Sequence, residues 1–503
     1  MIDRLSDELL LGLSRTVTEQ TGLHFSRERW PDLERGLRSA AGKLGFPDAE
    51  SCARRLLSAP LTRQETEILA GELTVGETYF FREKKSFEIL SNQILPEIAR
   101  LRQNTERRLR IWSAGCCTGE EPYSIAILLD RILPDLRQWQ VTILGTDINP
   151  HFLQKASAGV YSEWSFRDSP SWLKQGYFKQ VGANHYEILP SIKERVVFSY
   201  LNLAEGGYPS LVTNTNAMDL IFCRNVLMYF SPEKARHVIH NFHRSLVEKG
   251  WLVVSPTETS CELFSRFGAV QFDGVTFYQK GEPSSFTATL PFEASEPVVG
   301  WDEAEQTVAL PSLFDFKPAP QVSVPEPVVE ISVADSGRTP YEEALALFNQ
   351  GNYEQAARKL EAEGDSSPAA SDSAALWARI CANLGDLDHA RSWAEKALST
   401  NKLNAGLHYL NAVILDEQGL TDEAFAALKR TLYLDPNFVL AHYSLGNSAL
   451  RQKKFKEAER HFANTRTLLE SYQLNEVLPH SDGLVAGRLR EMVESASAME
   501  KTA

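Results

Sequence analysis

The sequence lacks the features of a membrane or secreted protein. It has no apolar run near the roughly 20 residues that a membrane-spanning helix requires. Cysteine is scarce, and six residues scattered over 503 are too few for a disulfide framework. The segment from Met1 to Leu11 has early acids and no small-residue cleavage site, so we expect no signal peptide. These absences predict a cytoplasmic protein without direct membrane insertion.

Basic residues are also in short supply. The chain has 52 Lys and Arg against 66 Asp and Glu, a formal net charge of −14. An excess of acid disfavours binding along a nucleic-acid backbone, and no Asn-Pro-Pro-Tyr-type base-stacking motif is present. Nucleic acid is therefore not an expected partner. Hydrophobic residues at 43% fit a globular protein, and the length predicts two to four domains of about 150 residues.

A change in composition divides the chain at residues 281–340. This stretch holds nine of the 24 prolines, with ten acids against two bases. Repeated proline prevents helices and strand ladders, and like charges keep a segment extended. We therefore predict a disordered linker between two folded parts.

The part after the linker repeats itself at a fixed spacing. Two series carry the period: Gly351, Gly385, Gly419 and Lys453, and, five positions further on, Ala356, Ala390, Ala424 and Ala458. A period of about 34 residues, with glycine in a turn and a small residue where two helices touch, resembles the tetratricopeptide repeat. We predict an all-α array of four units over 341–475, the first degenerate, and a helical or disordered tail over 476–503. Such an array offers a concave surface to a protein partner; the alternative is a spacer without a partner.

The segment 1–72 reads as a small helical domain. Apolar residues recur at helical spacing, in the series Leu9, Leu10, Leu13 and the series Leu33, Leu37, Ala40, Ala41, Leu44. Arg35 and Arg38 lie on the polar side of the second series, where they face outward together.

Buried strands alternate with helical stretches from about residue 105 to 280. The expected strands are 109–115, 141–147, 196–202, 219–225 and 251–255, with a closing hairpin around Asp273 and Gly274. Alternation of this kind predicts an α/β fold with a doubly wound, mostly parallel sheet. Ligands of such sheets bind at the carboxyl ends of the strands.

The ends of the first two strands carry residues suited to a nucleoside. Gly115 and Gly119 allow a tight turn and a close approach of the backbone, and Asp147 can accept hydrogen bonds from both hydroxyls of a ribose. The loop lacks the Gly-x-Gly-x-x-Gly spacing of a dinucleotide site, and Asp147 follows Gly115 at more than the roughly 20 residues typical of that site. A nucleoside without phosphates, such as S-adenosylmethionine, fits better; the alternative is an α/β core without a cofactor.

Three sequence blocks resemble one family. They are Phe80-Phe81-Arg82-Glu83, the run from Trp112 to Ser124, and the run from Phe222 to Phe230. Their order and spacing resemble those of the CheR family, S-adenosylmethionine-dependent methyltransferases that esterify chemoreceptor glutamates for sensory adaptation. The resemblance covers about residues 5–280. It implies a class I methyltransferase domain over 73–280, S-adenosyl-L-homocysteine as the product, and no metal.

The resemblance also implies the site residues. The cofactor contacts fall on Gly76, Thr78, Arg82, Glu121, Asp147, Asn202, Leu203, Arg224 and Asn225, and the catalytic residues are Tyr229 and Arg82. Gly76 departs from the pattern, because many members have asparagine there. No His or Lys stands in these blocks, which suits a substrate carboxylate that is already ionised at neutral pH.

The resemblance points to receptor contacts as well. Arg35 and Arg38 are the expected substrate-binding residues, facing the acidic methylation helices of chemoreceptor cytoplasmic domains. A small antiparallel subdomain is expected at about 177–197. Its short loop, 182–184, predicts no dependence on a receptor tether peptide. The repeats are expected to recruit a signalling partner or to restrain the enzyme; the remaining alternative is an inactive scaffold.

Overall fold

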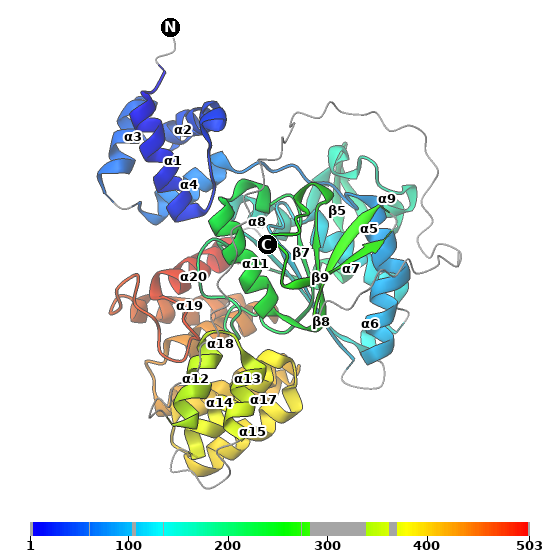
Figure 1. Ribbon diagram of the computed structural model, residues 1–503, viewed down its shortest axis with the longest axis vertical. Helices are drawn as coiled ribbons and strands as arrows, with labels where there is room; N and C mark the ends of the chain where they lie inside the picture. The colour runs from blue at the N-terminus through cyan, green and yellow to red at the C-terminus, as the bar shows by residue number, and fades with distance from the viewer. Residues whose placement is uncertain are drawn as a thin grey trace.

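The computed structural model describes residues 4–59, 61–102, 107–133, 135–272, 274–281, 339–361 and 370–500. The linker predicted over 281–340 lies almost wholly outside the described residues, as does Asp273. Three parts are visible in Figure 1: a helical N-terminal domain, a central sheet with helices around it, and a helical array packed against the sheet domain.

The N-terminal domain is a bundle of four helices, α1 (Asp7–Thr21), α2 (Trp30–Lys43), α3 (Ala49–Ser58) and α4 (Arg63–Leu73), with a short 3-10 turn at Arg27–Arg29. The apolar faces seen in the sequence form its core, where Leu10, Leu13, Leu33 and Leu37 are at most 1% exposed. Thr62 and Glu65 form a capping box that satisfies the first N–H groups of α4. The predicted helical domain is confirmed.

The chain then passes through α5 (Lys84–Ile89), a π-helical turn at Leu90–Ile94 and α6 (Leu95–Arg102) into a seven-stranded sheet. Its strands are β1 (Arg108–Ala114), β2 (Gln140–Asp147), β6 (Val196–Tyr200), β7 (Met218–Cys223), β8 (Leu246–Val254), β9 (Phe267–Phe272) and β10 (Val275–Lys280). The order is β6-β2-β1-β7-β8-β10-β9. The first five are parallel, and β10 pairs antiparallel with β8 and β9. The doubly wound sheet and its closing hairpin are confirmed.

Helices cover both faces of this sheet. The covering helices are α7 (Glu120–Ile132), α8 (Pro150–Ala158), α10 (Pro190–Lys193) and α11 (Pro232–Ser245). Ile111 and Phe222 point into one apolar core with α7, and Trp112 and Ile221 point into the other with α11. Side chains alternate between the faces of a strand, so β1 and β7 are buried along their whole length.

The small antiparallel sheet has three strands, in the order β3 (Val160–Ser162), β5 (His185–Ile188), β4 (Phe178–Gly182). Strands β4 and β5 follow α9 (Ser171–Tyr177) and lie within the predicted span of 177–197. Strand β3 precedes α9 and lies outside that span. The end of the predicted span, from Val196, belongs instead to β6 of the main sheet. Further 3-10 turns lie at Leu136–Gln138, Glu163–Phe166, Leu227–Tyr229 and Pro256–Glu258.

The C-terminal array consists of helix pairs: α12 (Pro340–Asn349) with α13 (Tyr353–Glu361), α14 (Ala370–Leu384) with α15 (Leu387–Thr400), α16 (Ala405–Glu417) with α17 (Thr421–Leu434), and α18 (Val439–Arg451) with α19 (Phe455–Leu469). Gly351, Gly385 and Gly419 have positive φ in the turns, and Lys453 adopts the same left-handed conformation with φ of 58°. The four periodic alanines are at most 2% exposed. The predicted repeat array is confirmed.

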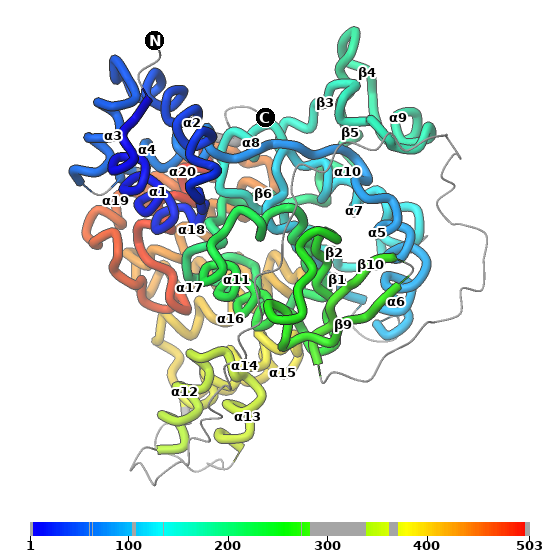
Figure 2. Tube along the Cα trace, turned by 45° about the horizontal axis from the view of Figure 1, so that its top comes forward, coloured from blue at the N-terminus to red at the C-terminus, as the bar shows by residue number. Residues whose placement is uncertain are grey.

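A last helix, α20 (Ala486–Glu500), packs against α19, β6 and α8. The C-terminal helices run from α12 and α13, far from the N-terminal domain, to α19 and α20, which lie nearer to it (Figures 1 and 2). Among the helices that the structure describes, none is long and apolar enough to cross a bilayer.

Candidate functional site

A pocket opens at the carboxyl ends of the parallel strands. It holds about 990 Å³ of empty space including its mouth, within the range of roughly 300–1,000 Å³ typical of small-molecule sites. The segment before α5, the loops after β1, β2, β6 and β7, and the end of α1 form its walls. Its lining includes the expected Thr78, Arg82, Glu121, Asp147, Asn202, Leu203, Arg224, Asn225 and Tyr229.

Asp147 ends β2 at the floor of this pocket. Its Oδ2 accepts the N–H of Cys117 at 2.9 Å, and its Oδ1 accepts the N–H of Asn149 at 2.8 Å. Burial raises the pKa of Asp147 to about 6, although both of these backbone donors act to lower it. Each oxygen keeps a lone pair, so the carboxylate can accept two further hydroxyl donors.

The turn that delivers Cys117 depends on Gly115. Its φ is +80°, and a Cβ there would lie 2.5 Å from Cγ2 of Val226. Only glycine fits both constraints without strain. The glycine predicted to permit close approach therefore brings the β1 loop against the loop after β7.

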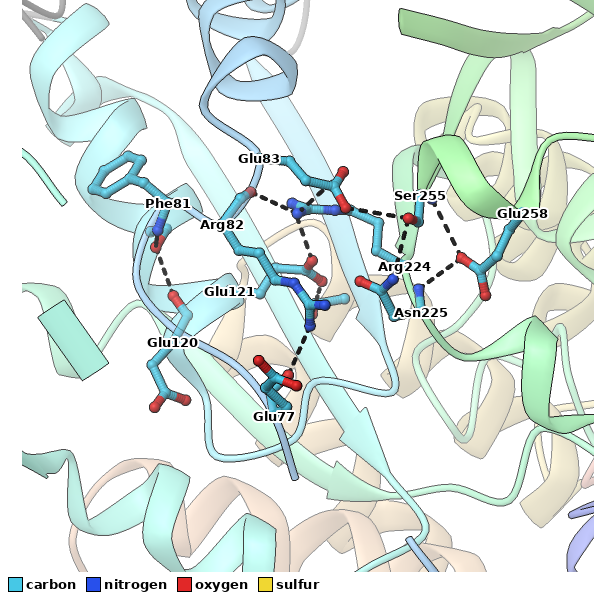
Figure 3. A network of polar contacts seen from close by, with 12 residues as sticks. Glu77, Phe81, Arg82, Glu83, Glu120, Glu121, Arg224, Asn225, Ser255 and Glu258 are labelled. Atoms are coloured by element: carbon cyan, nitrogen blue, oxygen red, sulfur yellow. Dashed lines mark hydrogen bonds and ion pairs between the residues drawn. The ribbon is translucent and has the colours of Figure 1, made fainter. Parts of the chain in front are cut away.

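Arg224 lies at the centre of a charged network in the pocket wall (Figure 3). Its Nη2 donates to the carbonyl of Arg82 at 2.5 Å and lies 3.4 Å from Oε2 of Glu83, while Nη1 lies 3.4 Å from Oε2 of Glu121. Ser113 also donates to Glu121, at 2.7 Å. Burial raises the pKa of Glu121, and the charge of Arg224 opposes that shift. The guanidinium holds two carboxylates in one wall.

Glu258 fixes the loop that follows β7. Its two oxygens accept the N–H groups of Asn225 at 2.6 Å and Met228 at 3.2 Å. Asn225 has φ of 59°, so the loop turns sharply there. Sequence analysis missed Glu258 because it lies outside the three blocks; its capping-box pattern with Ser255 is a signal that finds it.

Tyr229 joins the loop after β7 to the N-terminal domain. Its carbonyl accepts the N–H of His24 at 2.7 Å, and the guanidinium of Arg29 lies 5.4 Å from the centre of its ring. Burial raises the pKa of Tyr229, and the positive charges of Arg29 and Arg82 oppose the shift. Arg29 was missed by sequence analysis, because a lone arginine before a helix carries no local signal.

Arg35 and Arg38 lie on α2 and are not among the residues that line the pocket. Arg35 pairs with Asp32 at 2.6 Å and its side chain is 79% exposed. Arg38 pairs with Glu34 at 2.6 Å. Neither side chain is therefore positioned to contact a molecule in the pocket.

Gly76 is also absent from the residues that line the pocket. A Cβ on Gly76 would lie 2.6 Å from the ring of Phe152, which does line it. The space that an asparagine side chain would need at position 76 is therefore filled by Phe152.

Comparisons with known proteins agree with this geometry. The family model "CheR methyltransferase, SAM binding domain" matches residues 76–273. The chain is 32% identical over 257 residues to "Chemotaxis protein methyltransferase" of Borreliella burgdorferi, covering 51% of this chain and 89% of that protein. The chain belongs to the CheR methyltransferase family. It is thus an S-adenosylmethionine-dependent methyltransferase.

Other relatives extend the comparison. The family member described here is 35% identical over 217 residues to "Chemotaxis protein methyltransferase 2" of Vibrio cholerae, covering 43% of this chain and 74% of that protein. It is 28% identical over 422 residues to "Probable biofilm formation methyltransferase WspC" of Pseudomonas putida, covering 84% of this chain and 89% of that protein. A tetratricopeptide repeat model matches 341–406 and 409–465.

The pocket residues fit S-adenosylmethionine. Two buried polar atoms of residues that line the pocket have no hydrogen-bond partner and are not in the ion pairs described above: Nε of Arg224 and Oδ1 of Asn225. Buried polar groups are normally satisfied, so these atoms indicate a ligand with both donors and acceptors. The amino-acid group and the ribose of S-adenosylmethionine carry donors and acceptors of these kinds. Within the described residues, no cluster of His, Cys, Asp or Glu is arranged to hold a metal ion.

Proposed function

We propose that this CheR-family methyltransferase esterifies glutamate side chains on the cytoplasmic domains of chemoreceptors, and that it acts in the cytoplasm. The observation that carries the proposal is the convergence of Asp147, Arg224 and Tyr229 on one pocket at the carboxyl edge of the sheet. The relatives named as chemotaxis methyltransferases support the same substrate class.

The proposed mechanism needs alignment and not a general base. When bound, S-adenosylmethionine supplies a methyl group on a positively charged sulfur. Asp147 accepts the ribose hydroxyls, and the Arg224 network orients the amino-acid group. Arg82 and Arg29 place positive charge near Tyr229, where it attracts an ionised glutamate. Tyr229 orients the acceptor oxygen, and the surrounding apolar walls exclude water.

Arg35 and Arg38 enter the proposal as an encounter surface for acidic receptor helices. Replacing both with glutamate should raise the KM for receptor and leave kcat unchanged, since neither lines the pocket. Arg54→Glu is a matched control, because Arg54 is an exposed, ion-paired arginine on the neighbouring α3. Equal effects of the two changes would remove the encounter role.

The test of the function uses purified protein, labelled S-adenosylmethionine and a panel of receptors from chemotaxis and biofilm-formation systems. Label that transfers to receptor and is released by mild alkali identifies a carboxyl ester. Alkali-stable label would contradict glutamate methylation. Tyr229→Phe should lower kcat while cofactor affinity is kept; full turnover of this variant would show that the hydroxyl has no orienting role.

A further inference from the structure

The turns of the repeat array touch the catalytic domain at every period. A Cβ on Gly351 would meet the side chain of Arg244, one on Gly385 would lie 3.3 Å from Val247, and one on Gly419 would lie 3.1 Å from Gln140. At the fourth turn, Nζ of Lys453 pairs with Glu194 at 2.7 Å. The four turns form a continuous seam, defined here by residues 351, 385, 419 and 453.

The seam follows the order of the strands in the sheet. The residues of the catalytic domain that the turns contact lie at the start of β8, then of β2, then of β6. Gly385 also faces Ala217, just before β7, and Arg108, at the start of β1. The spatial order β8-β7-β1-β2-β6 is that of the sheet itself. The array therefore covers the amino edge of the sheet, opposite the pocket.

Charged and polar groups meet across this seam, although the guanidinium of Arg108 and Oε1 of Glu417 have no hydrogen-bond partner there. Arg110 of β1 and Glu417 of α16, whose side chains are 2% and 6% exposed, form an ion pair at 3.8 Å. Gln140 donates to the carbonyl of Glu417 at 2.6 Å, and Asn216 donates to its carboxylate at 3.4 Å. A buried charge is costly without its partner, so this contact indicates a permanent interface.

The segment between β6 and β7 enters the array. Leu211 is buried in a cluster with Ala378 and Ala382 of α14 and Ile414 of α16. Val212 lines the adjoining cavity, of about 840 Å³ of empty space, together with side chains of α14 and α16. The groove between the first helices of the repeats is thus partly filled by the catalytic domain.

The other end of the same segment reaches the cofactor pocket and is held by α20. The guanidinium of Arg488, which is 3% exposed, lies 4.7 Å from the ring centre of Tyr200 and pairs with Glu205 at 3.8 Å. Glu205 in turn accepts Nδ2 of Asn202 at 2.7 Å. Asn202 lines the pocket, so two contacts connect α20 to the cofactor site.

We propose that the partner of the array is the catalytic domain of the same chain, and that Arg488 is a positioning residue for Asn202 in cofactor binding. The C-terminal helices contact residues 201–217 at two places, Leu211 through the array and Glu205 through Arg488 of α20. The second half of this proposal rests on the proposed cofactor pocket, whereas the first half does not. This docking leaves the surface of the array away from the seam for binding other proteins.

The first experiment cuts the full chain within residues 282–338, at an inserted protease site, and follows the two pieces by size-exclusion chromatography. Docking predicts that they elute together and bind S-adenosylhomocysteine as the uncut protein does. Pieces that separate at micromolar concentration would overturn the proposal. The outcome does not depend on methyl transfer, so it stands apart from the proposed function.

The second experiment measures S-adenosylhomocysteine binding by calorimetry in Arg488→Ala. The dissociation constant should rise about five- to tenfold, the KM for S-adenosylmethionine should rise with it, and kcat should hold. Arg488→Lys should restore part of the affinity. Glu205→Gln, which weakens the link between Arg488 and Asn202 from the side of the catalytic domain, should reproduce part of the loss of affinity.

Arg451→Ala is the matched control, because Arg451 pairs with Asp416 inside the array. It should leave the dissociation constant unchanged. Unchanged affinity in both Arg488→Ala and Glu205→Gln would overturn the positioning role. If the unaltered protein fails to bind S-adenosylhomocysteine, the proposed cofactor pocket fails, while the cleavage experiment still decides whether the array is docked.

Discussion

The two edges of the central sheet differ in what their buried charged groups face. At the carboxyl edge, Arg224 and Asn225 keep atoms without hydrogen-bond partners, facing an open pocket. At the amino edge, Arg110 is paired with Glu417 from a segment far away in the sequence. The first, or open, edge borders the pocket, and the second, or closed, edge is covered by the chain's own array. Changes at the first should alter affinity, and changes at the second should alter stability.

The largest expected effect lies at the closed edge. Glu417→Ala leaves the guanidinium of Arg110 buried without its carboxylate, which should lower the free energy of unfolding by about 3–5 kcal/mol. Denaturant titration measures this loss, and affinity of the folded variant for S-adenosylhomocysteine should change less than about threefold. Glu423→Ala, which removes an exposed array carboxylate paired with Arg391, should cost less than about 1 kcal/mol. Equal losses of unfolding free energy in the two variants would contradict the proposed difference between the two edges.

At the open edge, a substitution should lower ligand affinity and leave stability unchanged. Asp147→Ala removes the acceptor proposed for two ribose hydroxyls, so the dissociation constant for S-adenosylhomocysteine should rise about 100-fold. Stability should be kept, because burial already disfavours the ionised carboxylate in the ligand-free protein. Calorimetry and thermal unfolding on the same sample test both halves. Affinity within fivefold of the unaltered protein would contradict the ribose-binding role.

Much of the open edge could be predicted from sequence, because its signals are local. The Gly115 turn, the acid that ends β2 and the block around Arg224 each lie within a few residues of a strand end, where parallel sheets place their ligands. The period of the glycines and alanines likewise predicted the helix pairs and their turns. Strand order was not predicted, since it depends on pairings between segments far apart in the chain.

The closed edge had no local signal. Neither Arg110 nor Glu417 stands in a motif, and the contact between them requires the array to turn back onto the sheet. The close contact between Gly76 and the ring of Phe152 could not be predicted for the same reason, because the two residues are far apart in the chain. The periodic glycines predicted turns, but they did not predict that these turns would contact a second domain.

The pH dependence of binding sharpens the comparison at the open edge. With a pKa of about 6, Asp147 is largely protonated at pH 5 and ionised at pH 7. Hydroxyl donors favour the ionised carboxylate, so affinity for S-adenosylhomocysteine should rise about tenfold from pH 5 to pH 7 and then level off. Calorimetry across this range measures the curve. Asp147→Asn should flatten it; an identical curve in that variant would assign the titration to another group.

The smallest expected effect tests the fourth turn of the seam, where Lys453 stands in the left-handed conformation that the other turns give to glycine. Lys453→Gly removes a backbone cost of about 1 kcal/mol and loses the pair with Glu194. Both side chains of that pair are more than half exposed, so it contributes less than the backbone does. The variant should therefore be more stable by about 0.5 kcal/mol, measured by denaturant titration. Glu194→Ala isolates the ion pair, and a destabilised Lys453→Gly beside a neutral Glu194→Ala would mean that the lysine supports the seam through contacts other than its charge.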